Sequence, residues 1–252
     1  MFDIVIPDDY IIFSEGTSDG TQDKYFYNDY WYKKDRYGGE GIAEYLACLL
    51  LKNSTLPPDK YADYEYGMIN GNPGCRSRHF LKPGESLITL YRLHQRTIGS
   101  NIADVVQTMD KEARIEYTLE FVLKQTGLDL REYFANTFYL DLLILNEDRH
   151  FNNLSIIFSR KEGFGEAPIF DNGKSLLVGN QSVNDRLSME ENITRVVARP
   201  FSGDHYWNYN QFSDYKSMQI DFDGLSNDLE KVKPCREKEV LLCNLKKYRC
   251  LN

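Results

Sequence analysis

The stretch Leu145–Phe158, LNEDRHFNNLSIIF, places many polar side chains directly before an apolar segment. From Asp148 to Asn153 it contains an acid, two bases and two amides within six residues. The apolar residues that follow, LSIIF, predict a buried strand. The ordinary explanation for such a polar cluster is capping of a helix end. The spacing of its residues therefore has to distinguish helix capping from a functional site.

That spacing indicates phosphoryl transfer. Asp148 and Asn153 are five positions apart, and Asp171 follows in APIFDNG, residues 167–173. Protein kinases use D-x-x-x-x-N for the base and one metal ligand, with a second Asp on a later strand. The reaction needs a carboxylate to accept the hydroxyl proton and oxygen ligands for Mg²⁺. We expect the strands beside the loop to bring these three side chains to the mouth of one hairpin. Chance would produce this joint pattern about once in a few hundred chains.

The rest of the chain predicts a strand-rich N-terminal part followed by a helical part. Strands are expected at four places: Tyr10–Ser14, either side of a turn at Asn28-Asp29, Tyr61–Leu93 and residues 167–173. Apolar periodicity predicts helices over residues 38–53, Ile102–Gln125 (with a C-cap at Gly127), Leu130–Leu145 and Glu237–Tyr248. The predicted fold class is α+β, with a β-rich lobe over residues 1–84, an α-helical lobe over 85–252 and a ligand cleft between them.

The composition limits the classes of partner. The chain has 252 residues, of which 42% are hydrophobic and 27% charged, as in ordinary globular proteins. A net charge of −8 argues against a nucleic acid or an anionic membrane as the main partner. The five cysteines show no CxxC pair, which favours free thiols in a reducing compartment. We find no signal peptide and no apolar stretch long enough for a membrane span, so a cytoplasmic location is expected.

Taken together, these motifs resemble those of the HipA-like serine/threonine kinases, the toxin kinases of bacterial toxin–antitoxin systems. Besides DRHFNN and APIFDNG, the loop TSDGTQDK (residues 17–24) is similar to the family's nucleotide loop, S-x-x-G-x-Q-x-K. Gly20, Gln22 and Lys24 match that pattern, and Thr17 stands where serine is usual. The resemblance covers most of residues 11–175, and the tail after Leu177 is not matched.

The resemblance implies a two-lobed protein-kinase-like fold with ATP in the cleft. Asp148 would be the catalytic base, and Asn153 and Asp171 would hold Mg²⁺. The residues implied at ATP are Thr17, Ser18, Gly20, Thr21, Gln22, Lys24, Lys33 and Glu44. The members of the family also phosphorylate their own nucleotide loop. Thr17 fits that position, with Ser18 and Thr21 beside it.

Two of these assignments leave alternatives open. Lys33, in YWYKKD, would contact the ATP phosphates, but Lys34 is the alternative because neighbouring strand residues point to opposite faces. Glu44 would pair with that lysine from the helix, although it lies opposite the aliphatic stripe, where a solvated glutamate is ordinary. Arg149 would orient the loop or pair with a phosphate. We interpret His150 as a hydrogen-bonded structural residue.

The remaining histidines and several basic residues receive no functional role. The histidines are His79, His94 and His205. Arg76, Lys82 and Arg92, near the expected lobe junction, could contact substrate or be solvated, and solvated side chains are the favoured interpretation.

The resemblance also implies partners. A protein substrate such as an aminoacyl-tRNA synthetase or another translation component is expected, together with an antitoxin or repressor protein, and neither direct nucleic-acid nor membrane binding. HipA itself carries an additional N-terminal subdomain, and this chain starts almost at the kinase lobe, so a minimal member of the family or a separate core subunit is expected. Two alternatives stay open. The letters D-R-H-x-x-N also resemble phosphatidylinositol kinases, which suggests a lipid or small-molecule kinase, and the fold would also suit a pseudokinase binding module.

Overall fold

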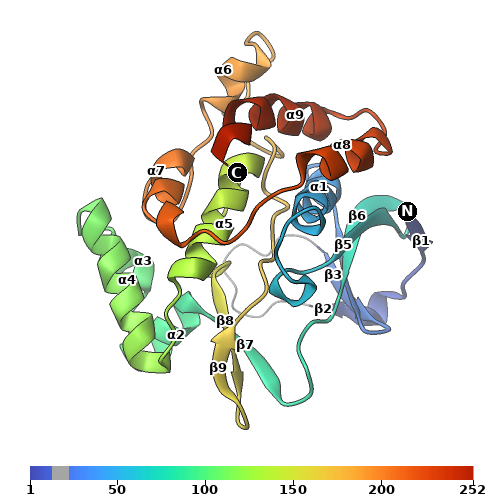
Figure 1. Ribbon diagram of the computed structural model, residues 1–252. Helices are drawn as coiled ribbons and strands as arrows, with labels where there is room; N and C mark the ends of the chain where they lie inside the picture. Colours follow the sequence, from blue (N-terminus) through green and yellow to red (C-terminus); the bar gives the residue numbers. More distant parts are fainter. Residues whose placement is uncertain (13–22, 252) are drawn as a thin grey trace. The chain divides into compact units, whose positions relative to one another are not determined.

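The computed structural model describes residues 1–12 and 23–251, and its contacts divide the chain into two compact units (Figure 1). The sheet unit comprises Met1–Phe80, Asp171–Val196 and Gln219–Asn252, and the helical unit comprises Leu81–Phe170 and Val197–Met218. The units differ from the expected lobes at 1–84 and 85–252, because two C-terminal segments belong with the N-terminal residues. Within the sheet unit, the C-terminal helices pack against the N-terminal one, α1.

The sheet unit contains a six-stranded sheet in the order β1-β5-β6-β4-β3-β2. Its strands are β1 (Phe2–Ile4), β2 (Ile11–Ile12), β3 (Lys24–Tyr27), β4 (Tyr30–Lys34), β5 (Tyr64–Ile69) and β6 (Asn72–Arg78). The turn predicted between β3 and β4 is confirmed. Asn28 and Asp29 have φ values of 49° and 67°, as a two-residue hairpin turn between twisted strands requires.

One long helix, α1 (Glu40–Lys52), packs on β5 and β6 of this sheet. Its approach is close at Gly41, where a Cβ atom would lie 2.5 Å from the carbonyl carbon of Gly74 in β6. The amides of Gly39 and Gly41 donate to the Asp35 carboxylate at 2.8 and 2.7 Å, which fixes the start of the helix. The inner face of α1 is therefore held directly over β6.

The later helices of the sheet unit are α6 (Met189–Ile193), α8 (Phe222–Glu230) and α9 (Arg236–Tyr248). Both α8 and α9 contact α1, and α6 contacts α9, as Figure 1 shows. The helix predicted over Glu237–Tyr248 is confirmed as α9. Short 3-10 turns occur in this unit at η1 (Asp8–Tyr10), η2 (Pro58–Lys60) and η4 (Arg249–Leu251), and in the helical unit at η3 (Ser213–Tyr215).

The helical unit contains a three-stranded sheet in the order β7-β8-β9 and the two longest described helices, α4 (Lys111–Thr126) and α5 (Arg131–Ile144). Its strands are β7 (Glu85–Thr89), β8 (Ser155–Ser159) and β9 (Gly163–Glu166). Its other helices are α2 (Leu90–Thr97), α3 (Ile102–Val106) and α7 (His205–Asn210). The rings of Phe134, Phe138, Phe201 and Phe212 form the centre of its core, with centroid separations of 5.5–6.3 Å.

The structure corrects two predictions in this unit. The helix expected over Ile102–Gln125 is two helices, because the Asp110 carboxylate accepts from the Ala113 amide at 3.0 Å and starts a new helix. Residues 167–173 form no strand in the described chain, since β9 ends at Glu166. The predicted strand LSIIF and the helix over Leu130–Leu145 are confirmed as β8 and α5. None of the described helices has the length and apolar character needed to cross a bilayer.

Candidate functional site

Lys33 lies at the centre of a buried charge cluster in the sheet unit. Its Nζ donates to Glu44 Oε1 at 3.0 Å and to Asp171 Oδ1 at 2.7 Å. Only 13% of the Lys33 side chain and 1% of the Glu44 side chain are exposed. Burial alone would lower the pKa of Lys33, but the two carboxylates raise it well above its usual value, so Lys33 is a cation here.

Glu44 fixes the peptide next to Asp171 as well as the lysine. Its Oε2 accepts from the Asn172 amide at 2.8 Å, while Oε1 accepts from Lys33. The Tyr64 hydroxyl lies 3.4 Å from both Lys33 Nζ and the Asp171 amide. Asp171 has a φ of 61°, a left-handed conformation that is uncommon outside glycine and occurs at functional turns. The alternative that Glu44 is an ordinary solvated glutamate is wrong, because the close approach of α1 to the sheet buries its side chain.

Lys33 and Lys34 do face opposite sides of β4. Lys34 Nζ lies 3.9 Å from Asp23 Oδ2 and 4.9 Å from the centre of the Tyr25 ring, away from the Glu44 cluster. Lys24 stands directly opposite Lys33 in the β3–β4 ladder. Burial and the nearby Lys33 ammonium lower the pKa of Lys24. Two lysines of adjacent strands therefore lie near the same acidic pair.

Five residues of the predicted nucleotide loop lie outside the described residues: Thr17, Ser18, Gly20, Thr21 and Gln22. Their roles remain predictions from the sequence. Lys24, the last residue of the loop motif, is described because it begins β3.

The helical unit holds the second group of predicted residues, beginning where α5 ends. Leu145 stops the helix in a left-handed conformation with a φ of 57°. Asn146 then organises the turn: its Nδ2 donates to the buried Asp141 carboxylate at 3.1 Å, and its Oδ1 accepts from the Asp148 amide at 2.9 Å. His205, to which the sequence assigned no role, places Nε2 2.8 Å from the Asn146 carbonyl oxygen. Burial lowers the pKa of His205, so a neutral ring donates this hydrogen bond.

Arg149 is the buried anchor of this loop, not a phosphate ligand. None of its side chain is exposed, and its Nε and Nη2 each lie 2.9 Å from an oxygen of Asp141. Its Nη1 donates to the carbonyl oxygens of Asn153 at 3.2 Å and of Phe170 at 2.8 Å. One guanidinium group thus connects the loop to the residue that precedes Asp171. Of the two alternatives for Arg149, the structure favours orientation of the loop.

Asp148, the predicted base, has a side chain that is about one-third exposed and lies beside two basic side chains. Its Oδ1 lies 3.6 Å from His150 Nε2 and 3.9 Å from Arg199 Nη1. The expectation of a hydrogen-bonded His150 is wrong on one side of the ring, because Nδ1 is buried without a partner among the described atoms. Arg199 was missed in the sequence, because nothing in the local pattern links it to a loop fifty residues earlier.

Asn153 and Asp171 carry the oxygen atoms that Mg²⁺ prefers. The Asn153 Nδ2 donates to the Asp148 carbonyl oxygen at 2.9 Å, which leaves the amide oxygen as the atom able to bind a metal. The Asp171 carboxylate is one-third exposed. Within residues 1–12 and 23–251, no three His, Cys, Asp or Glu side chains gather into a metal site. The donor chemistry therefore fits a metal that phosphate oxygens and water also ligate.

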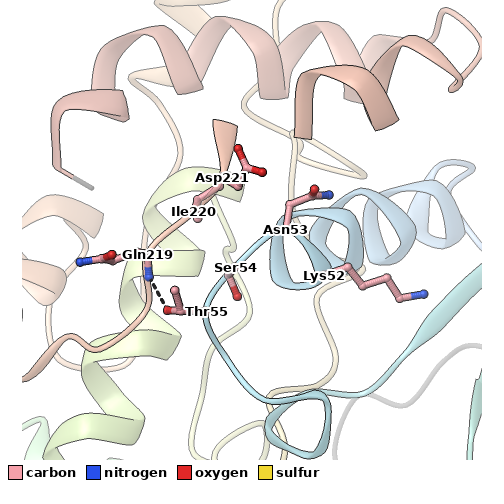
Figure 2. Close-up of a pocket in the computed structure, with 7 residues that line it drawn as sticks. All are labelled: Lys52, Asn53, Ser54, Thr55, Gln219, Ile220 and Asp221. Carbon is pink, nitrogen blue, oxygen red and sulfur yellow. Dashed lines mark hydrogen bonds between the residues drawn. The ribbon is translucent and has the colours of Figure 1, made fainter. Parts of the chain in front are cut away.

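The sheet unit also has a hollow of about 440 Å³ at the far end of α1, which Figure 2 shows. Its lining residues are Lys52, Asn53, Ser54, Thr55, Gln219, Ile220 and Asp221. An antiparallel bridge between Ser54 and Ile220 joins its two walls. Lys52 is eight positions beyond Glu44, about 12 Å along a helix. None of the predicted site residues that the structure describes lines this hollow.

Solved structures identify the architecture. No protein-family model and no curated protein matches the sequence. The Helicobacter pylori proinflammatory kinase CtkA superposes with a TM-score of 0.67 at 16% identity, covering 98% of this chain and 94% of that one. HipA of Shewanella oneidensis MR-1, solved with HipB and its operator DNA, superposes with a TM-score of 0.52 at 13% identity, covering 97% and 68%. The chain has a kinase-like fold. In this fold a strand lysine pairs with a helix glutamate, as Lys33 and Glu44 do here.

The kinase-like fold confirms the predicted α+β class and, at the level of fold, the resemblance to HipA-like kinases. Lys33 lies on β4 and Glu44 on α1. The loop with Asp148 and Asn153 lies between α5 and β8.

Proposed function

We propose that the chain is an ATP- and Mg²⁺-dependent serine/threonine protein kinase of HipA-like type. The observation that carries the proposal is the buried Lys33 ammonium between Glu44 and Asp171. Active protein kinases require the same pairing of a strand lysine with a helix glutamate, beside the aspartate that binds the metal. The coincidence of this cluster with the Asp148–Asn153 spacing supports a catalytic protein over a scaffold.

In the proposed reaction, Asp148 accepts the proton of a substrate hydroxyl while that oxygen bonds to the γ-phosphorus of ATP. The bond from the γ-phosphorus to the bridging oxygen breaks, and its electron pair leaves with ADP. Lys33 would hold the ATP phosphates, and Asn153 and Asp171 would hold Mg²⁺, which supplies charge neutralisation when bound. The proposal requires these groups of both units to act on one nucleotide.

The first test is to incubate the purified chain with ATP and Mg²⁺, a mixture of candidate proteins and, separately, phosphoinositide vesicles. Phosphate on serine or threonine of a protein is the expected result. Phosphate on the lipid alone would instead identify a lipid kinase. Stabilisation by ATP and Mg²⁺ without transfer to any acceptor would identify a pseudokinase.

Replacing Lys33 by methionine is expected to weaken ATP binding by about 10–100-fold, because charge-assisted hydrogen bonds contribute about 1.5–3 kcal/mol each. Lys34→Met is the matched control, since it removes the same charge from the neighbouring position on the opposite face. Affinity is measured by calorimetric titration at a temperature where circular dichroism shows both variants folded. A larger loss in Lys34→Met than in Lys33→Met would show that the assignment is reversed.

We also propose that the kinase phosphorylates its own nucleotide loop at Thr17, Ser18 or Thr21. The proposal rests on the hydroxyl-rich sequence TSDGT and on the family resemblance. A phosphate there adds a charge of about −1.5 to −2 beside the ATP phosphates and should weaken ATP binding. Peptide mass spectrometry after prolonged incubation with ATP and Mg²⁺ measures it. Unmodified hydroxyl groups at all three positions would contradict this regulation.

The HipA structure contains its antitoxin HipB and operator DNA. For this chain we propose a protein antitoxin or repressor, without direct DNA contact by the kinase itself. We propose a translation component, such as an aminoacyl-tRNA synthetase, as the substrate, and the cytoplasm as the location.

A further inference from the structure

The segment Val197–His205 of the helical unit lies against the loop that carries Asp148. The ring of Phe201 meets the ring of Phe151 edge to face at 6.0 Å. His205 Nε2, at the other end of the segment, lies 2.8 Å from the Asn146 carbonyl oxygen. These contacts hold a stretch some fifty residues later in the sequence beside the predicted base.

Internal hydrogen bonds fix the backbone of this segment. The buried Asn208 accepts from the Ser202 amide at 3.0 Å and donates to the carbonyl oxygens of Ser202 and Arg199, at 3.0 and 3.3 Å. Arg114 Nη1 donates to the Phe201 carbonyl oxygen at 2.9 Å. The Arg199 side chain is therefore attached to a backbone whose position is fixed, as a specificity-determining side chain requires.

The Arg199 guanidinium lies close to Asp148 but does not form a hydrogen bond with its carboxylate. Its Nη1 lies 3.9 Å from Asp148 Oδ1, longer than a hydrogen bond, and 57% of its side chain is exposed. An ion pair this exposed contributes little to stability, so the fold alone gives no reason for a cation here. Arginine binds carboxylates through two parallel hydrogen bonds, which makes it a selective receptor for them.

We propose that Arg199 selects peptide substrates that carry an acidic residue two positions from the phosphorylated serine or threonine. The inference rests on the proposed kinase function. An acceptor hydroxyl must lie about 3 Å from the Asp148 carboxylate to transfer its proton. Arg199 is then within about 7 Å of that hydroxyl, and side chains two positions apart in an extended peptide are about 6.6 Å apart on the same side.

A peptide explains the neighbouring surface better than a phosphate group of the nucleotide does. Val197 and Tyr206, on either side of Arg199 in the sequence, are 58% and 45% exposed. An extended peptide whose acid bound Arg199 would also cover apolar side chains of this segment. A transferring phosphoryl group would cover neither.

The test uses the full chain and serine peptides that differ only in having Glu, Gln or Lys two positions before or after the serine. The parent is expected to prefer a Glu peptide over its Gln counterpart by about tenfold in kcat/KM, mostly through KM. In Arg199→Gln this preference should fall to about onefold, and in Arg199→Glu the Lys peptide should become preferred. Arg160→Gln removes the same charge from an exposed turn of the same unit and should keep the preference of the parent.

Three results would overturn the inference in distinguishable ways. If the parent phosphorylates Glu and Gln peptides equally well, the proposed role of Arg199 is contradicted, while the kinase function is not. An equal loss of kcat on every peptide in Arg199→Gln places the side chain at the phosphoryl group instead. A parent that phosphorylates no peptide and no protein contradicts the proposed function itself.

Discussion

Replacing Asp148 by asparagine is expected to slow phosphate transfer by about 10²–10⁴-fold, the contribution that a positioned general base makes. Asparagine keeps the size of the side chain but cannot accept the hydroxyl proton. The fold should survive, because the Asp148 side chain is 36% exposed and its closest basic side chains, His150 and Arg199, are 3.6 and 3.9 Å away. Initial rates with radiolabelled ATP measure the loss, and a separate titration should show ATP affinity close to that of the parent.

The matched control is Asp104→Asn, which removes an exposed carboxylate from α3 in the same unit. It should leave the rate unchanged. If Asp148→Asn kept more than about a tenth of the parent rate, its role as base would be contradicted. His150 would then be the group to test next, because its Nε2 faces the same carboxylate.

Replacing Arg149 by methionine is expected to destabilise the helical unit by about 3–5 kcal/mol, because it leaves a buried charge without its partner. Only 3% of the Asp141 side chain is exposed, and Arg149 supplies its two closest charged donors. The change also removes the donor to the carbonyl oxygens of Asn153 and Phe170, so phosphate transfer should fall with stability. Urea unfolding followed by the fluorescence of Trp207, in a Trp31→Phe background, measures the free energy in this unit.

Arg131→Met is the control for this experiment, because it breaks an ion pair with Asp129 whose side chains are 38% and 54% exposed. Such exposed pairs contribute about 0–1 kcal/mol. The double change Arg149→Met with Asp141→Leu should recover part of the stability by removing the orphaned charge. A loss in Arg149→Met no larger than in Arg131→Met would contradict the anchoring role.

Local patterns predicted most elements of the fold. The Asn28-Asp29 turn, the C-cap at Gly127 and the strand after Asn153 all depend on neighbours in sequence, and the structure has them. The two wrong predictions of secondary structure also came from local sequence patterns. The helical periodicity across Ile102–Gln125 hid a break, because Asp110 satisfies the amides of a new helix with its own side chain. APIFDNG has the composition of a strand, yet residues 167–173 form no strand and only Ile169 makes an isolated bridge.

By itself, the sequence determined the chemistry available to this protein: an acid and an amide five positions apart, a strand lysine and a later aspartate. These spacings are numbers of residues along the covalent chain, so they are fixed before the chain folds. Only the tertiary structure paired Lys33 and not Lys34 with Glu44, buried Glu44 against Asn172, and brought Arg199 beside Asp148. Those outcomes depend on how closely α1 approaches the sheet and on how a distant segment packs on the loop. Desolvation and packing between remote residues set these contacts, and no local pattern encodes them.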